Sequence, residues 1–348
     1  MIKKKLSIVD IANKLNISKT TVSFILNGRA REKRISEELV ERVLKFVKEV
    51  GYKPNSLAKS LRTGKSHIIG LMVENIADPF FANIARYIED AAYKSGYRII
   101  YCSTDNDAEK TSELITMFRD RHVDGYIIAP PVGIEEDVAE LIKDGLPVVL
   151  FDRHLANVDS SYVMVDNLKG TYEATEYLIE QGYKNIAFIT FKSDQEQMEA
   201  RLNGYKKALE ESNLEPRVKE FVFNQNIKSF IAPLTEFIKN NSDLDAILFG
   251  NNRIGTSGLK VINSLGIKIP DDLAVISFDD HDVFELYSPS ITAIAQPIEE
   301  IADKTINLLL DKMNSKTEDI EIKKITLQTE LIVRGSSQVK AKKLSTVK

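Results

Sequence analysis

The sequence predicts an all-α head followed by an α/β body of two doubly wound parallel-sheet subdomains. Residues 1–65 show short amphipathic helical patterns and no strand pattern. From Ile68 onward, short apolar runs such as "IIGLMV", "PVVLFD" and "DAILFG" alternate with helical stripes. Near-continuous apolar runs between helices are typical of parallel strands buried on both faces. There are too many such runs for one sheet, so two sheets are expected.

The charge of the chain is unevenly distributed. The formal net charge is −4 over 348 residues, yet residues 1–65 carry 16 Lys and Arg against six Asp and Glu. A basic head on an acidic body favours a polyanionic partner such as nucleic acid, although a solvated basic helix face would give the same count. Cys102 is the single cysteine, which excludes an intrachain disulfide and fits a reducing cytoplasm. No signal peptide or membrane-spanning run is recognised, so a cytoplasmic location is expected.

Three helices are expected in the head. Ser7 can cap the first, in which apolar residues recur at i, i+3, i+4 and i+7. Asn16 suits a left-handed turn, and Ser18 can cap a second helix close behind, which predicts a helix-turn-helix. A third helix from about Ser36 to Val50 closes a small core.

The outward face of the second helix is the first candidate binding surface. Phe24 and Thr20 lie opposite the apolar face of Val22 and Ile25. In a DNA major groove, Thr20 and its neighbour Lys19 would meet base edges, and Phe24 would pack on a thymine methyl. The basic residues available to neutralise phosphates are Lys3, Lys4, Arg29, Arg31, Lys33 and Arg34. The alternative is a three-helix protein-interaction module with Phe24 at an interface.

A linker with a short helical pattern follows the head. Ser56–Arg62 makes under two turns, too short to stay helical in water, so we expect order only against a partner. Leu57 and Leu61 on a basic, conditionally folded segment suggest a minor-groove wedge, with a plain interdomain linker as the alternative.

The amino-acid sequence of the head resembles that of the lactose/galactose-repressor (LacI/GalR) family of bacterial transcription regulators. The matching stretches are "SIVDIANKLNISKTTVSFILNG" and "RISEELVERVLKFVKEVGYKPNSLAKSLRTGKS". The resemblance implies that Lys19, Thr20 and Phe24 read the major groove and that Leu61 opens the central step of a palindromic operator. Many members carry a polar or charged residue where this chain has Phe24, which leaves the operator sequence open but not the binding of DNA. The implied DNA-binding set is Ser18, Lys19, Thr20, Thr21, Phe24, Asn27, Arg29, Asn55, Ala58 and Leu61.

Polar residues follow several of the expected strands in the body. Ligands of such sheets bind beyond the carboxyl ends of the strands. These ends carry Asp152–Arg153, Asp166–Asn167, Asn251–Asn252 and Asp279–Asp280. Phe80 and Phe81 add an aromatic face. A polyhydroxylated ligand such as a sugar suits this combination of carboxylates, guanidinium, amides and aromatic surface. Helix capping by Asp and Asn is the alternative for each residue alone.

The body resembles the effector-binding core of the same family, which has the fold of periplasmic sugar-binding proteins. Its markers include "DPFF", "VVLFDR", "RLNGY" and "TAIAQP". The effector contacts implied are Phe80, Asp152, Arg153, Arg201, Asn251, Asp279 and Gln296. Many relatives have Asn-Asp where this chain has Asn251–Asn252, which leaves the charge and hydroxyl pattern of the ligand open.

These patterns predict the following organisation. A helix-turn-helix domain spans 1–53, a hinge helix or linker 54–65, an effector-binding core 66–338 and a disordered tail 339–348. The core divides into an N-subdomain (about 66–165 and 298–322) and a C-subdomain (about 166–296 and 323–338). The tail has no leucine heptads, so a homodimer is expected, with the helix at 80–93 as a candidate interface.

The sequence predicts a regulator and not an enzyme. No G-x-S-x-G elbow and no His pair at metal-ligand spacing occur, and neither a metal nor a cofactor is expected. We expect a repressor that binds a palindromic operator as a dimer and responds allosterically to a sugar-like molecule. The alternatives are an activator or corepressor-dependent regulator of the same family and, from another class, a sugar-binding receptor without DNA function.

Overall fold

The computed structural model describes residues 6–52, 64–222, 230–315 and 321–338. The chain divides into two compact units, Met1–His67 and Ile68–Lys348, and each is described by itself. The expected hinge helix, with Asn55, Ala58 and Leu61, and the expected tail lie outside the described residues.

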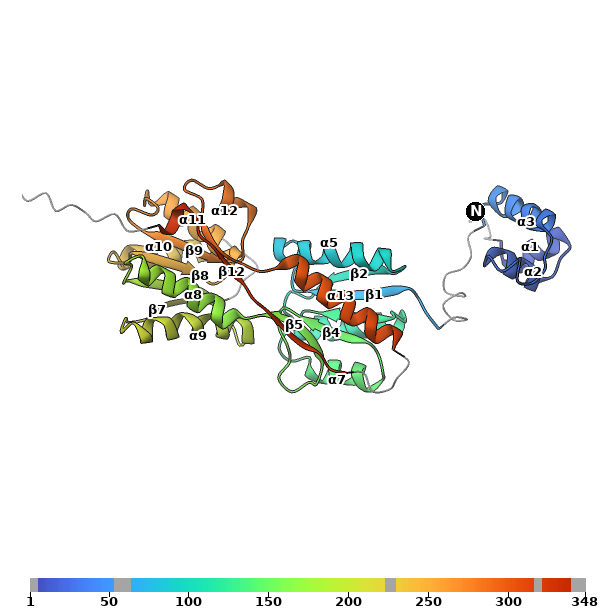
Figure 1. Cartoon of the computed structure of the whole chain (residues 1–348), viewed down its shortest axis with the longest axis horizontal. Coiled ribbons are helices and arrows are strands. Elements are labelled where there is room, and N and C mark those ends of the chain that lie inside the picture. The colour runs from blue at the N-terminus through green and yellow to red at the C-terminus, as the bar shows by residue number, and fades with distance from the viewer. Residues whose placement is uncertain (1–5, 53–63, 223–229, 316–320, 339–348) are drawn as a thin grey trace, which may run out of the picture. The chain divides into compact units, whose positions relative to one another are not determined.

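The first unit, called the head, contains the three expected helices (Figure 1): α1 (Ile8–Leu15), α2 (Lys19–Leu26) and α3 (Glu37–Glu49). Ser7, Ser18 and Ser36 cap them, because each hydroxyl accepts a hydrogen bond from a backbone N–H in the first turn. Asn16 ends α1 in the left-handed conformation with φ 54°, which turns the chain directly into α2. The helix-turn-helix predicted from these residues is therefore confirmed.

The head is held together by one small apolar core. One face of each helix contributes to it, and the fully packed members are Ile11, Ala12, Val22, Ile25 and Val43. Phe24 lies outside this core and is half buried. The loop after α2 folds back toward it, so that the Lys33 Nζ atom lies 5.3 Å and the Arg29 guanidinium carbon 5.8 Å from the centre of the Phe24 ring. Phe24 therefore lies away from the apolar core, on the face opposite Val22 and Ile25, and its ring is partly covered by two cations.

The second unit is the body, and its first lobe is a six-stranded sheet in the order β11-β5-β4-β3-β1-β2, with all strands parallel. Its strands are β1 (Ile68–Val73), β2 (Arg98–Ser103), β3 (Gly125–Ile128), β4 (Val148–Phe151), β5 (Ser161–Val165) and β11 (Lys324–Leu327). Helices α5 (Pro79–Lys94) and α13 (Ile298–Asn314) cover one face of this sheet (Figure 1). Helices α6 (Ala108–Asp120) and α7 (Glu135–Lys143) cover the other.

The second lobe repeats this plan with the strand order β12-β10-β9-β8-β6-β7, in which β12 alone runs antiparallel to its neighbour. Its strands are β6 (Ile186–Lys192), β7 (Arg217–Val222), β8 (Ala246–Phe249), β9 (Ala274–Phe278), β10 (Thr292–Ala295) and β12 (Glu330–Ile332). Helices α8 (Asn167–Glu180) and α9 (Glu196–Glu211) pack on one face, and α10 (Ile231–Asn240) and α11 (Asn252–Ser264) on the other. Short helices α12 (Asp282–Leu286) and η2 (Gly335–Ser337) complete the lobe. Two sheets covered on both faces confirm the predicted fold class.

The chain passes between the lobes three times: from β5 to α8, from β10 to α13 and from β11 to β12. Strand β11 belongs to the first lobe, so the return segment of that lobe reaches Leu327 and not only residue 322, as the sequence had suggested. Strands β10, β11 and β12 were not foreseen as strands. Each is only three or four residues long, and β11 and β12 are partly exposed, so they lack a continuous apolar run.

Candidate functional site

One cavity lies between the two lobes, at the carboxyl ends of their strands, with a volume of about 380 Å³. This is within the ~300–1,000 Å³ range of small-molecule pockets. All seven residues predicted to contact an effector line it: Phe80, Asp152, Arg153, Arg201, Asn251, Asp279 and Gln296. They come from both lobes: Arg201 lies within α9, and the other six lie at the ends of strands or at the start of a helix, where the parallel topology brings them together.

Arg153 is the buried cation of the first lobe. It follows β4, and its side chain is 3% exposed. Its Nε donates to Asp152 Oδ2, its Nη1 to Asn106 Oδ1 and its Nη2 to Glu74 Oε2, each at 3.0 Å. Two carboxylates therefore neutralise this guanidinium and fix its plane.

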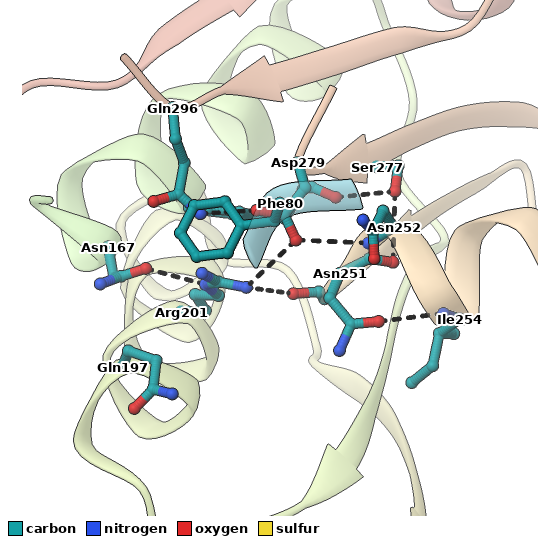
Figure 2. Close-up of polar contacts among 12 residues, drawn as sticks. Phe80, Asn167, Gln197, Arg201, Asn251, Asn252, Ile254, Ser277, Asp279 and Gln296 are labelled. Atoms are coloured by element: carbon teal, nitrogen blue, oxygen red, sulfur yellow. Dashed lines mark hydrogen bonds and ion pairs between the residues drawn. The ribbon is translucent and has the colours of Figure 1, made fainter. Parts of the chain in front are cut away.

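Arg201 is the corresponding cation of the second lobe and comes from the middle of α9 (Figure 2). Its Nε donates to Asn167 Oδ1 at 2.8 Å and its Nη1 to the Gly250 carbonyl at 2.9 Å. The guanidinium carbon also lies 3.6 Å from the centre of the Phe278 ring. Burial lowers the pKa of Arg201, an effect opposed by the charge of Asp279, whose Oδ2 is 3.9 Å from Nη1. The residue nevertheless stays cationic.

Asp279 is oriented by several donors around it. It sits directly after β9 in the left-handed conformation with φ 65°, which turns its side chain into the cavity. Gln296 Nε2 donates to its Oδ1 at 2.6 Å, and the backbone N–H of Asn252 lies 3.4 Å from its Oδ2 (Figure 2). Asn251 caps α11 by accepting a hydrogen bond from the Ile254 N–H at 2.9 Å, so its Oδ1 atom holds a structural position.

The first lobe adds an aromatic wall and a helix-capping carboxylate. Phe80 and Phe81 are buried and stacked edge to face with 5.0 Å between ring centres. Asp78 caps α5 through its Oδ1, which accepts the Phe80 N–H at 3.0 Å. Burial raises the pKa of Asp78, and the charge of Asp279 across the cavity adds to that rise.

Sequence reasoning missed Gln197. It lines the cavity from the first turn of α9, is 4% exposed, and its Oε1 atom has no hydrogen-bond partner in the described structure. Its Nε2 donates to Gln195 Oε1 at 3.3 Å. Nothing in the sequence separates this amide from the surface amides of other helices, because its burial is a property of the folded chain.

The head places its predicted DNA contacts on and after α2. Lys19 and Thr20 are exposed at its amino end. Ser18 and Thr21 are hydrogen-bonded to each other at 2.8 Å, Asn27 Nδ2 donates to the Ser23 carbonyl, and Arg29 pairs with Glu32 at 2.8 Å. Lys19 and Thr20 therefore present exposed side chains at the amino end of α2, while Ser18 and Asn27 support the two ends of the helix.

Two kinds of feature are absent from residues 6–52, 64–222, 230–315 and 321–338. No group of three or more His, Cys, Asp or Glu side chains there is arranged to hold a metal ion. No helix in the part of the chain that is described is both long and apolar enough to cross a membrane.

Comparison with known proteins identifies the family. Residues 7–55 match the family model described as bacterial regulatory proteins, lacI family, and residues 175–337 match the periplasmic binding protein-like domain. The HTH-type transcriptional regulator RegA of Clostridium saccharobutylicum is 30% identical, over 95% of this chain and 99% of its own. The ribose operon repressor of Halalkalibacterium halodurans is 29% identical, over 95% of this chain and 97% of its own.

Solved structures show the same architecture. The complex of the regulator CelR with cellobiose is 27% identical, with a TM-score of 0.70 over 95% of this chain and all of that one. A LacI family regulator of Enterococcus faecium with bound ribose is 28% identical, with a TM-score of 0.68 over 78% of this chain and 99% of that one. The helix-turn-helix, the two-lobed body and a 30% identical regulator of the same length together place this chain in the LacI family of bacterial regulatory proteins, as a transcriptional regulator and not an enzyme.

Proposed function

We propose that this regulator is a repressor that binds a palindromic operator as a homodimer and is controlled by an uncharged, hydroxyl-rich molecule in the interlobe cavity. The carrying observation is the charge pattern of that cavity. Its two buried guanidiniums, Arg153 and Arg201, already lie against the carboxylates of Asp152, Glu74 and Asp279. Hydroxyl groups can donate to these carboxylates and accept from the remaining guanidinium N–H groups.

A phosphorylated ligand fits this cavity poorly. Its phosphate would have to approach carboxylates whose negative charge repels it, while the two cations are already paired. The aromatic wall of Phe80 and Phe81 suits the apolar face of a sugar ring. Relatives with bound ribose and cellobiose support a sugar as the effector class.

A dimer is supported by the exposed surface of α5 and the edge strand β2. Tyr93 is 62% and Tyr101 50% exposed there, with Tyr87 and Ile100 nearby on the same two elements. Large apolar side chains on an edge strand and its covering helix are characteristic of an interface. A second copy of the chain related by a two-fold axis would cover them and would match a palindromic site.

The hinge completes the proposed switch. Effector binding changes how closely the lobes approach and thereby the separation of the two hinge segments in the dimer, so Leu61 gains or loses its place in the minor groove. A DNA-binding regulator of this kind acts in the cytoplasm. An activator or a corepressor-dependent regulator would use the same head, hinge and cavity, but the effect on transcription would be the opposite.

The test has two steps with the full chain. An operator is first selected from random duplexes and confirmed by gel retardation. A thermal-shift panel of pentoses, hexoses, disaccharides, sugar phosphates and purines then finds the effector, and each hit is tested for its effect on operator affinity. A neutral sugar that changes operator affinity supports the proposal. Binding of sugar phosphates or purines alone would refute the effector class. Failure to select any operator from the random duplexes would refute the DNA function.

A further inference from the structure

The two lobes of the body touch each other through side chains at the rim of the cavity. Asp78, which caps α5 of the first lobe, accepts a hydrogen bond from Asn252 Nδ2 in the first turn of α11 of the second lobe, at 3.3 Å. Asn252 is buried and Asp78 half buried, so this contact is shielded from bulk water. It joins the two helix ends that face each other across the cavity.

A second contact spans the lobes outside the cavity. His154, which follows β4 of the first lobe, places its Nδ1 atom 3.2 Å from Glu196 Oε2 in the first turn of α9. The His154 ring is stacked on Tyr162 with 4.9 Å between centres, which fixes its orientation. The arrangement of the lobes in this structure is therefore supported by side-chain contacts at two separate points.

The charge at the rim makes the identity of residue 252 important. Asp78 faces Asp279 of the other lobe and Glu74 of its own, and both carboxylates raise its pKa, while the Asn252 amide counteracts them by hydrogen bonding. Bringing the lobes together thus moves two like charges toward each other and buries one of them. A neutral amide donor at position 252 is the group that offsets this cost; a carboxylate there would add to it.

We propose that Asp78 and Asn252 form an interlobe latch that sets how readily the lobes close and, through closure, how tightly the effector binds. Asn252 acts as a positioning residue, because it holds the lobe that carries Arg201 and Asp279 against the first lobe. The link from closure to effector affinity rests on the proposed function; the latch itself does not. The His154–Glu196 pair supports the same arrangement of the lobes from outside the cavity.

The experiment is a charge-swap cycle in the full chain. Asn252→Asp places a carboxylate against Asp78 and is expected to raise the unfolding equilibrium constant of the body about tenfold at pH 7, since it replaces a hydrogen bond to a charged group by repulsion. Adding Asp78→Asn restores an amide-carboxylate pair with the two groups exchanged. The unfolding equilibrium constant of the double variant is expected to return to within about threefold of that of the starting chain. Asn still caps α5, so that helix is kept. Asn263→Asp, exposed near the end of the same helix, is the matched control.

The outcomes separate the latch from the switch. If Asp78→Asn does not rescue Asn252→Asp, the two residues act independently and the latch is wrong, whatever the effector does. If the rescue occurs, D-ribose, D-xylulose and cellobiose are titrated as probes: any of them that binds should bind about tenfold more weakly to Asn252→Asp and recover in the double variant. If the double variant restores the unfolding equilibrium but no effector changes operator binding, the latch is supported and the proposed function is refuted.

Discussion

Replacing Gln197 by Met is expected to stabilise the free chain and to weaken effector binding at the same time. Gln197 is buried at the cavity wall, and its Oε1 atom has no partner in the described structure. A buried acceptor without a donor costs about 1–3 kcal/mol. Met has nearly the same length and no polar oxygen, so it removes that cost without opening a cavity.

The size of the effect follows from the local contacts. The hydrogen bond from Gln197 Nε2 to Gln195 Oε1 is 3.3 Å long and contributes little. Its loss leaves a net gain of about 1 kcal/mol, which corresponds to a melting temperature roughly 2–4 °C higher for a domain of this size. An effector hydroxyl that donates to Oε1 would lose its acceptor, and the affinity should fall about tenfold.

The measurement is thermal unfolding of the full chain with and without the effector found by the panel, followed by calorimetric titration. Gln181→Met, at the carboxyl end of α8 and away from the cavity, is the control and should change neither quantity. A lower melting temperature together with unchanged affinity would show that Gln197 serves only the packing of the second lobe. The reasoning would then be refuted.

Three other predictions follow from the same structure. Phe24→Ala should weaken operator binding more than binding to unrelated duplex, measured by fluorescence anisotropy, since the ring lies beside two cations and is proposed to meet the bases; equal losses would contradict base reading. Leu61→Ala should likewise affect operator and not non-specific DNA, and loss of both would argue against a wedge. Asp78 has a folded-state pKa raised by burial and nearby charge, so its stabilising contribution is present at acid pH and is lost as the pH rises through that pKa. The melting temperature of Asp78→Asn, relative to that of the parent chain, should therefore rise as the pH increases from 4 to 7 (about the range in which a raised carboxyl titrates). A difference between the two melting temperatures that does not change with pH would contradict the raised pKa of Asp78.

Local signals predicted the head well. Ser7, Ser18 and Ser36 act within their own helix turns, and Asn16 acts within a single turn, so neighbouring residues were sufficient to place them. The half burial of Phe24 was not predictable in the same way, because it depends on how the loop at 29–34 folds back over α2.

In the body, alternating strands and helices predicted which residues would meet at the strand ends. Arg201 and Asp279 were identified this way, helped by the family resemblance, and the structure brings them to the same cavity. Asn252 was among the predicted strand-end residues, but neither its contact with Asp78 nor the burial of Gln197 was predicted. The Asp78–Asn252 contact joins residues 174 positions apart in the sequence, and only the three-dimensional structure reveals it.

The most direct test of the account is a linkage measurement on the full chain. Operator affinity is measured at several effector concentrations, and effector affinity is measured for free and operator-bound protein. A shared coupling free energy of ~1–3 kcal/mol, equal in both directions, is predicted, because both ligands would bias the same closure of the lobes. An operator affinity that stays constant at saturating effector would contradict the central claim.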